Sequence, residues 1–168
     1  VVYDHLKQEL FCARDRFGEK PFYYHFDSEQ FLFASEMKAL FAAGVPKNVS
    51  DKFIYNYLLY GVSDDVYHPE NTFYEQVKQL EPAHYLKITS EGQLEKQRYW
   101  TLECNNTQNI SVEEAIEQYR FLFRRSVERR LRSDVPVGSS LSGGLDSSSV
   151  VLEVNRIKGS RQEQKTFS

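Results

Sequence analysis

The residue types and spacing most suited to chemistry in this chain occur in one segment, Leu141-Ser142-Gly143-Gly144-Leu145-Asp146-Ser147-Ser148. Two adjacent glycines let a backbone approach a phosphate group closely, and the serine hydroxyls add hydrogen-bond donors. A lone carboxylate repels phosphate, so Asp146 fits such a site if a divalent cation joins it to the phosphate oxygens. The segment therefore predicts a site for a phosphorylated ligand and a cation.

The flanking residues predict the elements that hold this loop. An apolar stretch at residues 135–140 precedes it and an apolar-periodic stretch at residues 149–154 follows it, which indicates a strand, a loop and a helix. The N-terminus of a helix attracts anions through its free N–H groups and its dipole. The spacing is neither that of a Walker A loop nor that of a dinucleotide fingerprint. An ordinary Ser/Gly turn that caps a helix is the alternative.

Composition limits the classes of protein that the chain can belong to. It has 168 residues, 40% hydrophobic and 27% charged, which is typical of a globular protein of one or two domains. The net charge of −3 gives no nucleic-acid signature. No apolar run approaches the ~20 residues of a membrane span, and no signal peptide is visible. The two cysteines make no disulfide framework, so a reducing compartment, the cytoplasm, is expected.

The front half of the chain predicts antiparallel strands and short helices. Ser35 and Ser50 are the expected N-caps of helices at residues 36–43 and 51–60, and a short helical turn is expected at residues 73–79. The expected strands, each next to a polar turn, are residues 1–3, 10–13, 22–26, 30–34, 84–89 and 94–100.

The back half predicts a linker at residues 103–110, a long helix, and then a strand, the glycine-rich loop, a helix and a strand. The capping box Ser111-Val112-Glu113-Glu114 begins the long helix. Its apolar face is made of Val112, Ala115, Ile116, Tyr119, Leu122, Phe123, Val127 and Leu131. Its opposite face carries Arg120, Arg124, Arg125, Arg129 and Arg132. A solvated face is the first interpretation of these arginines, and a contact with a neighbouring domain or an anion is the second.

Several motifs, in order, resemble those of the glutamine-hydrolysing asparagine synthetases. The loop at residues 142–147 is similar to the S-G-G-x-D-S PP-loop of ATP pyrophosphatases, which binds the β,γ-pyrophosphate of ATP. The other motifs are ARDRFGEKPFYY at 13–24, ASEMKAL at 34–40, LEPAHYL at 80–86, RYW at 98–100 and SDVPVG at 133–138. The family more often has glycine where this chain has Ala83. The resemblance covers essentially the whole chain.

The resemblance implies a fold in two parts, truncated at both ends. Residues 1–92 are expected to be the C-terminal part of a class II glutamine amidotransferase domain, an antiparallel α+β fold of the N-terminal-nucleophile type. Residues 93–168 are expected to be the junction and the N-terminal part of the synthetase domain. That domain is α/β, with the parallel sheet of PP-loop adenine nucleotide hydrolases.

The resemblance also implies an activity, in which aspartate is activated with Mg-ATP as β-aspartyl-AMP and aminated with ammonia from glutamine. The substrates are aspartate, glutamine and ATP, the cofactor is Mg²⁺, and the assembly is a homodimer. By resemblance, the backbone of Leu141 meets the nucleotide and Asp146 is the carboxylate associated with Mg²⁺. The pyrophosphate cradle is Ser142, Gly143, Gly144, Ser147 and Ser148.

The chain departs from the family at the glutaminase site. That site uses an N-terminal cysteine, and neither Cys12 nor Cys104 stands at a chain start, so no catalytic residue is assigned. Cys12 is expected to be a small buried hydrophobe, and the chain alone is expected to be inactive. Two alternatives stay open: a relative that closes β-lactam rings or amidates another carboxylate, and a non-catalytic relic or interaction module.

Overall fold

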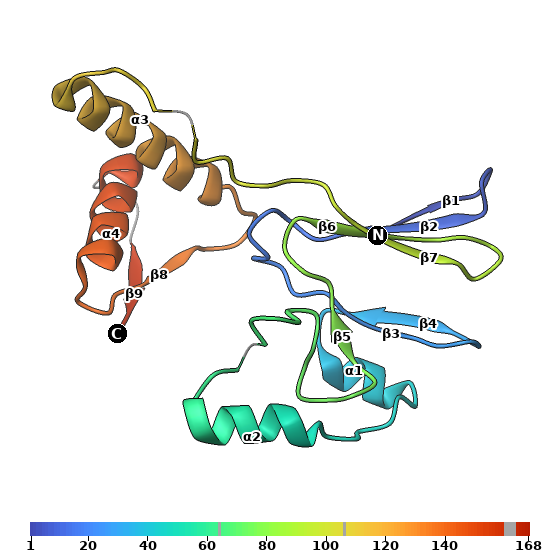
Figure 1. Ribbon diagram of the computed structural model, residues 1–168. Coiled ribbons are helices and arrows are strands. Elements are labelled where there is room, and N and C mark those ends of the chain that lie inside the picture. The colour runs from blue at the N-terminus through green and yellow to red at the C-terminus, as the bar shows by residue number, and fades with distance from the viewer. Residues whose placement is uncertain (64, 106, 160–163) are drawn as a thin grey trace. The chain divides into compact units, whose positions relative to one another are not determined.

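The computed structural model describes residues 1–63, 65–105, 107–159 and 164–168, and it divides the chain into two compact units. The first unit is Val1–Glu103 and the second is Cys104–Ser168. The first unit is α+β with antiparallel sheets (Figure 1). Among the described residues, none of the helices has the length and apolar character needed to cross a membrane.

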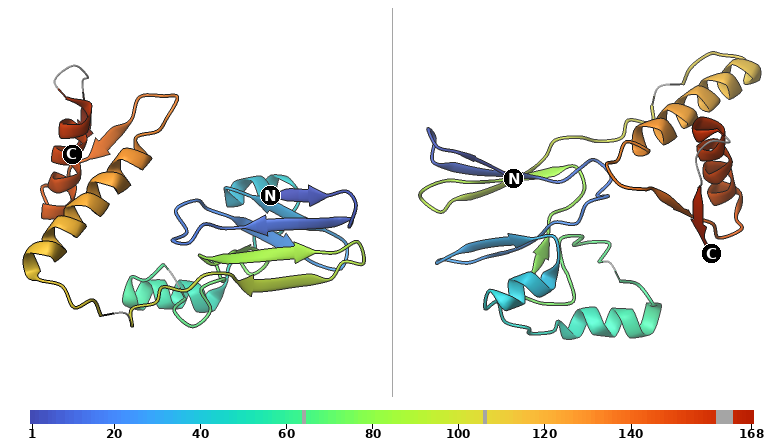
Figure 2. Two further views of the ribbon diagram at one scale, coloured as in Figure 1. Left: turned by 90° about the horizontal axis from the view of Figure 1, so that it is seen from above. Right: turned by 180° about the vertical axis from the view of Figure 1, so that it is seen from behind.

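A four-stranded antiparallel sheet forms one layer of the first unit, in the order β1-β2-β6-β7. Its strands are β1 (Val2–Asp4), β2 (Glu9–Ala13), β6 (His84–Ile88) and β7 (Leu94–Arg98), and Figure 2 shows them side by side. The strands expected in these four places are confirmed. Because β7 pairs with β6 along its whole length, it belongs to the first unit, and the compact units divide after Glu103.

A three-stranded antiparallel sheet forms the second layer, in the order β4-β3-β5. Its strands are β3 (Tyr23–Phe26), β4 (Phe31–Ala34) and β5 (Lys78–Gln79). The hairpin of β3 and β4 is confirmed, but the helical turn expected at residues 73–79 is wrong. The Thr72 hydroxyl donates to the carbonyl of Val77 (2.8 Å), and this side-chain bond holds the segment out of a helix so that β5 can pair with β3.

The core of the first unit contains residues from both sheets. Cys12 of β2, Leu86 of β6 and Leu80 are fully buried, and they pack with Tyr24 of β3. A second cluster contains Leu40, Val45 and Val77. Because one cluster joins strands of both sheets, the two layers are held together by apolar burial.

Two helices complete this unit, and only one of them has its expected cap. In α2 (Asp51–Tyr60) the Ser50 hydroxyl accepts from the N–H of Phe53 (3.4 Å), and Gly61 ends the helix at φ +67°, as expected. In α1 (Met37–Ala42) the N-cap is Glu36 rather than Ser35. The extended backbone of Glu36 (φ −138°) shifts the start of the helix by one residue.

Arg14 and Asp15 fix the turn that connects β2 to β3. The Arg14 guanidinium donates to the carbonyls of Leu80 (2.6 Å) and Gly18 (3.0 Å). The Asp15 carboxylate accepts from the N–H of Lys20 (3.0 Å), and this bond is the main cause that lowers the pKa of Asp15. Gly18 has φ +68°, and a Cβ there would lie 3.2 Å from the Arg14 guanidinium carbon. The Arg-Asp-x-x-Gly spacing therefore has a structural role.

The second unit contains α3 (Val112–Arg130), β8 (Gly138–Ser140), α4 (Leu145–Lys158) and β9 (Lys165–Phe167). Strands β8 and β9 pair in parallel, with α4 between them in the chain. The capping box is confirmed, since the N–H of Glu114 donates to Ser111 Oγ (3.1 Å) and the N–H of Ser111 donates to Glu114 Oε2 (2.9 Å).

The two faces of α3 are both largely exposed. Val127 is buried at 8% exposure, whereas Tyr119 and Leu122 are 68% and 59% exposed. The apolar periodicity correctly predicted the helix. The periodicity could not show which of these apolar side chains are buried against another element of the chain.

We expect Ser111→Ala to lower the free energy of unfolding of the second unit by ~1 kcal/mol, because it leaves the N–H of Glu114 without its acceptor. Urea unfolding followed by far-UV circular dichroism measures the change. Ser126→Ala is the matched control, since it removes a hydroxyl from the interior of the same helix. Equal losses in the two variants would contradict the capping role.

Candidate functional site

The glycine-rich loop joins the end of β8 to the start of α4. Residues 141–144 form the loop, and Gly144 is the N-cap of α4. The N–H of Leu141 donates to the carbonyl of Phe167 in β9 (2.7 Å). The loop is therefore tied to both parallel strands, and the first N–H groups of α4 have no acceptor within their own helix. The order of strand, loop and helix expected from the sequence is confirmed.

The two glycines leave the loop backbone open. Gly143 has φ +77°, a left-handed conformation that L side chains rarely adopt, and a Cβ built on it meets nothing within 4 Å. A Cβ on Gly144 would lie 3.5 Å from Ser142 Oγ, an ordinary contact. The open space above Gly143 fits a ligand that approaches the backbone directly.

The serines of the loop lie close to one another. Ser142 Oγ and Ser147 Oγ are 3.1 Å apart, and the Ser147 hydroxyl also donates to the carbonyl of Gly144 (3.1 Å). The N–H of Ser148 donates to the same carbonyl, the first main-chain bond of α4. These bonds bring together Ser142, Gly144 and Ser147 of the expected cradle, and Ser148 directly follows Ser147 in the first turn of α4.

Asp146 is exposed in the first turn of α4. Within the described ranges, no group of three or more His, Cys, Asp or Glu side chains could enclose a metal ion. Mg²⁺ is commonly bound by one or two carboxylates together with substrate phosphates and water. One exposed carboxylate beside an open glycine loop fits that mode, in which the cation arrives with a phosphorylated ligand.

The two cysteines lie in contrasting surroundings. Cys12 is fully buried in the core of the first unit, and burial raises the pKa of its thiol to about 11. Cys104 is exposed. A thiol with so high a pKa is a poor nucleophile at neutral pH, so the expected role of Cys12 as a small buried hydrophobe is confirmed.

The free energy of unfolding of the first unit should fall as the pH rises from 9 to about 11. The Cys12 thiol ionises near 9.0 in an unfolded chain but only near 11 in the folded one, so the folded state loses stability across this interval. Urea unfolding at several pH values measures the slope, and Cys12→Ala should show a shallower fall. If the free energy of unfolding falls equally steeply with pH in the native chain and in Cys12→Ala, the buried thiol is not the cause of the fall.

Comparison with known proteins assigns each half of the chain to a family. Residues 1–100 match the family described as Glutamine amidotransferase domain, and residues 118–168 match the family described as Asparagine synthase. The second match contains the glycine-rich loop.

Several curated relatives carry names that agree with these two families. The chain is 38% identical over 151 residues to glutamine-hydrolyzing asparagine synthetase 3 of Bacillus subtilis, which covers 89% of this chain and 24% of that protein. It is 35% identical over 154 residues to a putative glutamine-hydrolyzing asparagine synthetase 2 of Methanocaldococcus jannaschii, covering 89% and 29%. It is also 33% identical over 161 residues to a protein of Gibberella zeae named as an amidase, covering 94% and 23%. The chain thus spans about a quarter of the length of these relatives.

Proposed function

Because this chain belongs to the glutamine-hydrolysing asparagine synthetase family, we propose that it is part of an ATP-dependent ligase that converts aspartate into asparagine. The observation that carries this proposal is the open S-G-G-x-D-S loop between β8 and the N-terminus of α4. That loop lies in the part of the chain that matches the Asparagine synthase family. The cytoplasm is the proposed location.

The proposed chemistry explains why a ligase needs such a loop. The side-chain carboxylate of aspartate is a poor acyl donor at neutral pH, so it attacks the α-phosphate of ATP and pyrophosphate leaves. The resulting β-aspartyl-AMP then reacts with ammonia, and AMP departs. Negative charge accumulates on the departing pyrophosphate, and donors fixed in advance around that charge lower the barrier.

The residues of the loop have distinct proposed roles. The open backbone of Gly143 and Gly144 and the first N–H groups of α4 bind the pyrophosphate oxygens. The hydroxyls of Ser142, Ser147 and Ser148 add donors. The N–H of Leu141 is already bonded to Phe167, so its carbonyl is the backbone group proposed to meet the nucleotide.

Asp146 is proposed to hold Mg²⁺, which when bound neutralises charge on the phosphates. The Asp146 carboxylate would supply an oxygen ligand to the cation, which would arrive together with the phosphorylated ligand. Because Asp146 lies in the first turn of α4, it is held beside the proposed pyrophosphate site.

We assign the two units to the two domains of the family. The first unit is the C-terminal part of the class II glutamine amidotransferase domain, which supplies ammonia from glutamine. The second is the start of an α/β PP-loop domain, and the parallel pair of β8 and β9 supports its parallel sheet. The expected domain boundary between residues 92 and 93 stays a prediction, and it differs from the division of the compact units after Glu103 because β7 pairs with β6.

A second candidate is a related enzyme that amidates a different carboxylate. The similarity to the Gibberella zeae protein and to a Penicillium rubens protein that is also named as an amidase favours it. The two candidates share the loop and the ATP chemistry, and they differ only in the acceptor carboxylate.

The test is to express the complete reading frame that contains this chain and to supply ATP, glutamine and one carboxylate at a time. We expect amide formation with aspartate, and glutamine should be replaceable by ammonia. The 168-residue chain assayed alone is the control and should give no product. Amidation of another carboxylate but not of aspartate would favour the second candidate, and no amide from any carboxylate would refute both.

A further inference from the structure

The long helix α3 carries a high concentration of arginine. Residues 112–132 hold six arginines and no lysine. The helix dipole favours basic residues in the last turn, which accounts for Arg129 and Arg130. It does not account for Arg125, which lies more than one turn before the end of the helix. These charges therefore call for an explanation beyond the stability of the helix.

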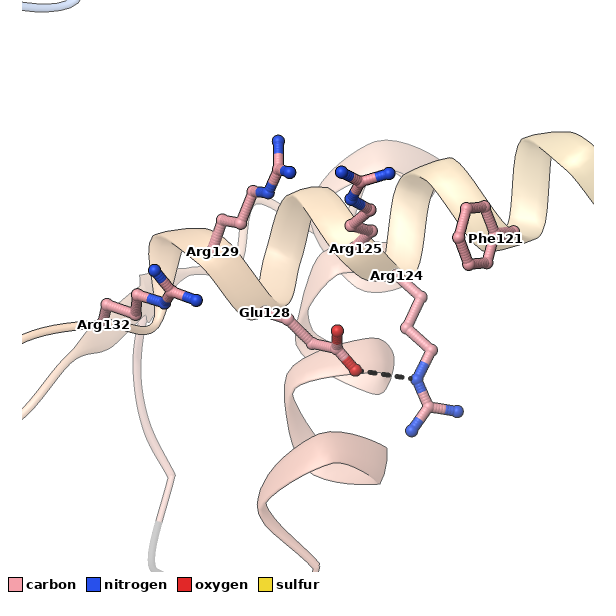
Figure 3. A pocket seen from close by; sticks show the side chains of 6 residues that line it. All are labelled: Phe121, Arg124, Arg125, Glu128, Arg129 and Arg132. Atoms are coloured by element: carbon pink, nitrogen blue, oxygen red, sulfur yellow. Dashed lines mark hydrogen bonds and ion pairs between the residues drawn. The ribbon is translucent and has the colours of Figure 1, made fainter.

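Three of these arginines lie in one row with an exposed aromatic ring. The row begins at Phe121, which is 62% exposed. Arg125, Arg129 and Arg132 follow at helical spacing, over roughly 10 Å of the helix axis at 1.5 Å per residue. This side of the helix is hollowed by a depression of about 650 Å³, a volume typical of pockets that hold small molecules. Its lining residues are drawn in Figure 3 and are Phe121, Arg124, Arg125, Glu128, Arg129 and Arg132.

The arginines of the depression differ in their partners. Arg124 pairs with Glu128 (3.1 Å), the one carboxylate in the lining. Figure 3 shows the guanidinium groups of Arg125 and Arg129 on the other side, pointing away from the helix. Within the part of the chain that the structure describes, the guanidinium groups of Arg125, Arg129 and Arg132 have no hydrogen bond or ion pair. Three positive charges of the depression are therefore left without a partner.

These unpaired charges favour a ligand with several phosphate groups. Arg125 and Arg129 repel each other because they lie one turn apart on the same helix. A guanidinium group binds two phosphate oxygens at once, and three such groups in a row suit a ligand that carries several negative charges close together. The exposed ring of Phe121, at the other end of the row, offers a flat face on which a nucleobase can stack. A nucleotide with several phosphates has both of these parts.

We propose that this depression binds a nucleoside polyphosphate, with the base stacked on Phe121 and the phosphates paired with the three arginines. The site is distinct from the loop at residues 142–148, since every residue that lines it belongs to α3 or lies just beyond its C-terminal end. A nucleotide bound here lacks the glycines and the Asp146 carboxylate that the proposed adenylation uses, so it is bound without being consumed. The inference does not depend on the proposed ligase activity.

Titration calorimetry of the 168-residue chain with ATP as the probe tests the site. EDTA is added because the site at residues 142–148 is proposed to use Mg²⁺, whereas the arginines need no cation. We expect the dissociation constant to rise at least tenfold between about 0.05 and 1 M sodium chloride, since solvent-exposed charges are screened by salt. R125E/R129E should weaken binding at least tenfold, whereas Asp146→Asn should leave the dissociation constant within about twofold of the native value.

Matched variants separate the contributions of charge, geometry and stacking. The control K7E/K20E reverses two exposed lysines of the first unit and changes the net charge as much as R125E/R129E does, so its dissociation constant should be unchanged. R125K/R129K keeps the charge but removes the planar guanidinium groups, so binding should weaken about threefold or more. Phe121→Ala should weaken the binding of ATP about fivefold or more and leave the binding of inorganic tripolyphosphate unchanged.

Four results would overturn the proposal: a native chain that does not bind ATP at low salt, equal binding of ATP by R125E/R129E, equal binding of ATP by Phe121→Ala, or a native chain that binds a short RNA strand but not ATP. The last result would indicate a nucleic-acid surface instead. Far-UV circular dichroism checks that each variant keeps its helices. If R125E/R129E fails to fold, R125K/R129K decides, because it preserves the charge of the helix.

Discussion

Asp146→Asn is expected to lower the rate of asparagine formation by the complete protein by about 100- to 1,000-fold. The amide keeps the size of the side chain but removes the charge that is proposed to hold Mg²⁺ beside the phosphates. Loss of a single fixed group that stabilises transition-state charge typically costs this much in rate. Initial rates at saturating ATP and aspartate, with ammonia as nitrogen donor, measure the change without involving the glutaminase reaction.

Asp51→Asn is the matched control for this prediction. Asp51 is also an exposed aspartate in the first turn of a helix, α2, but no glycine-rich loop precedes it. We expect its rate to stay within about twofold of the native rate. Equal rates for Asp146→Asn and the native protein would show that the carboxylate has no part in the reaction.

Leu86→Ala is expected to lower the free energy of unfolding of the first unit by ~2–5 kcal/mol. Leu86 is fully buried in β6, between β2 and β7, and the substitution removes apolar contacts and leaves a cavity. A domain of this size has a total stability of roughly 5–15 kcal/mol, so the loss is a large share of it. Urea unfolding followed by the fluorescence of the single tryptophan, Trp100, measures the change.

Leu58→Ala makes the same chemical change on the surface. The Leu58 side chain is 76% exposed on α2, so the free energy of unfolding should change by less than about 0.5 kcal/mol. If Leu86→Ala and Leu58→Ala lower the free energy of unfolding equally, Leu86 does not lie in the core of the first unit.

The sequence predicts most of the local structure because its signals are local. The hairpin of β3 and β4 follows from two aromatic runs around Asp27, whose carboxylate accepts from the N–H groups of Glu29 and Gln30. The caps at Ser50 and Ser111 each lie next to the helix that they begin. Such features depend only on residues that are close in the chain, so they can be predicted without knowledge of the fold.

The features that sequence reasoning missed depend on partners far away in the chain. Strand β5 is two residues long and exists because β3 offers it an edge. The S-G-G-x-D-S spacing predicted the loop, but not that the N–H of Leu141 is held by the carbonyl of Phe167. The same limit applies to α3, where periodicity separates two faces but gives no sign of what each one contacts.

Ala83, where this chain departs from the family pattern, has an unusual backbone conformation. It has φ +60° and is 1% exposed, so an L residue occupies a left-handed position in the core. Glycine adopts this conformation without steric cost, which explains why the family more often has glycine there.

The most direct test of the central claim is whether the complete protein exchanges labelled pyrophosphate into ATP. We expect exchange that requires aspartate and Mg²⁺ and proceeds without ammonia, because adenylate formation is reversible before nitrogen enters. We also expect AMP and pyrophosphate as the products of the full reaction. Aspartate-dependent cleavage of ATP to ADP and phosphate, with no exchange, would contradict a pyrophosphate site at residues 142–148.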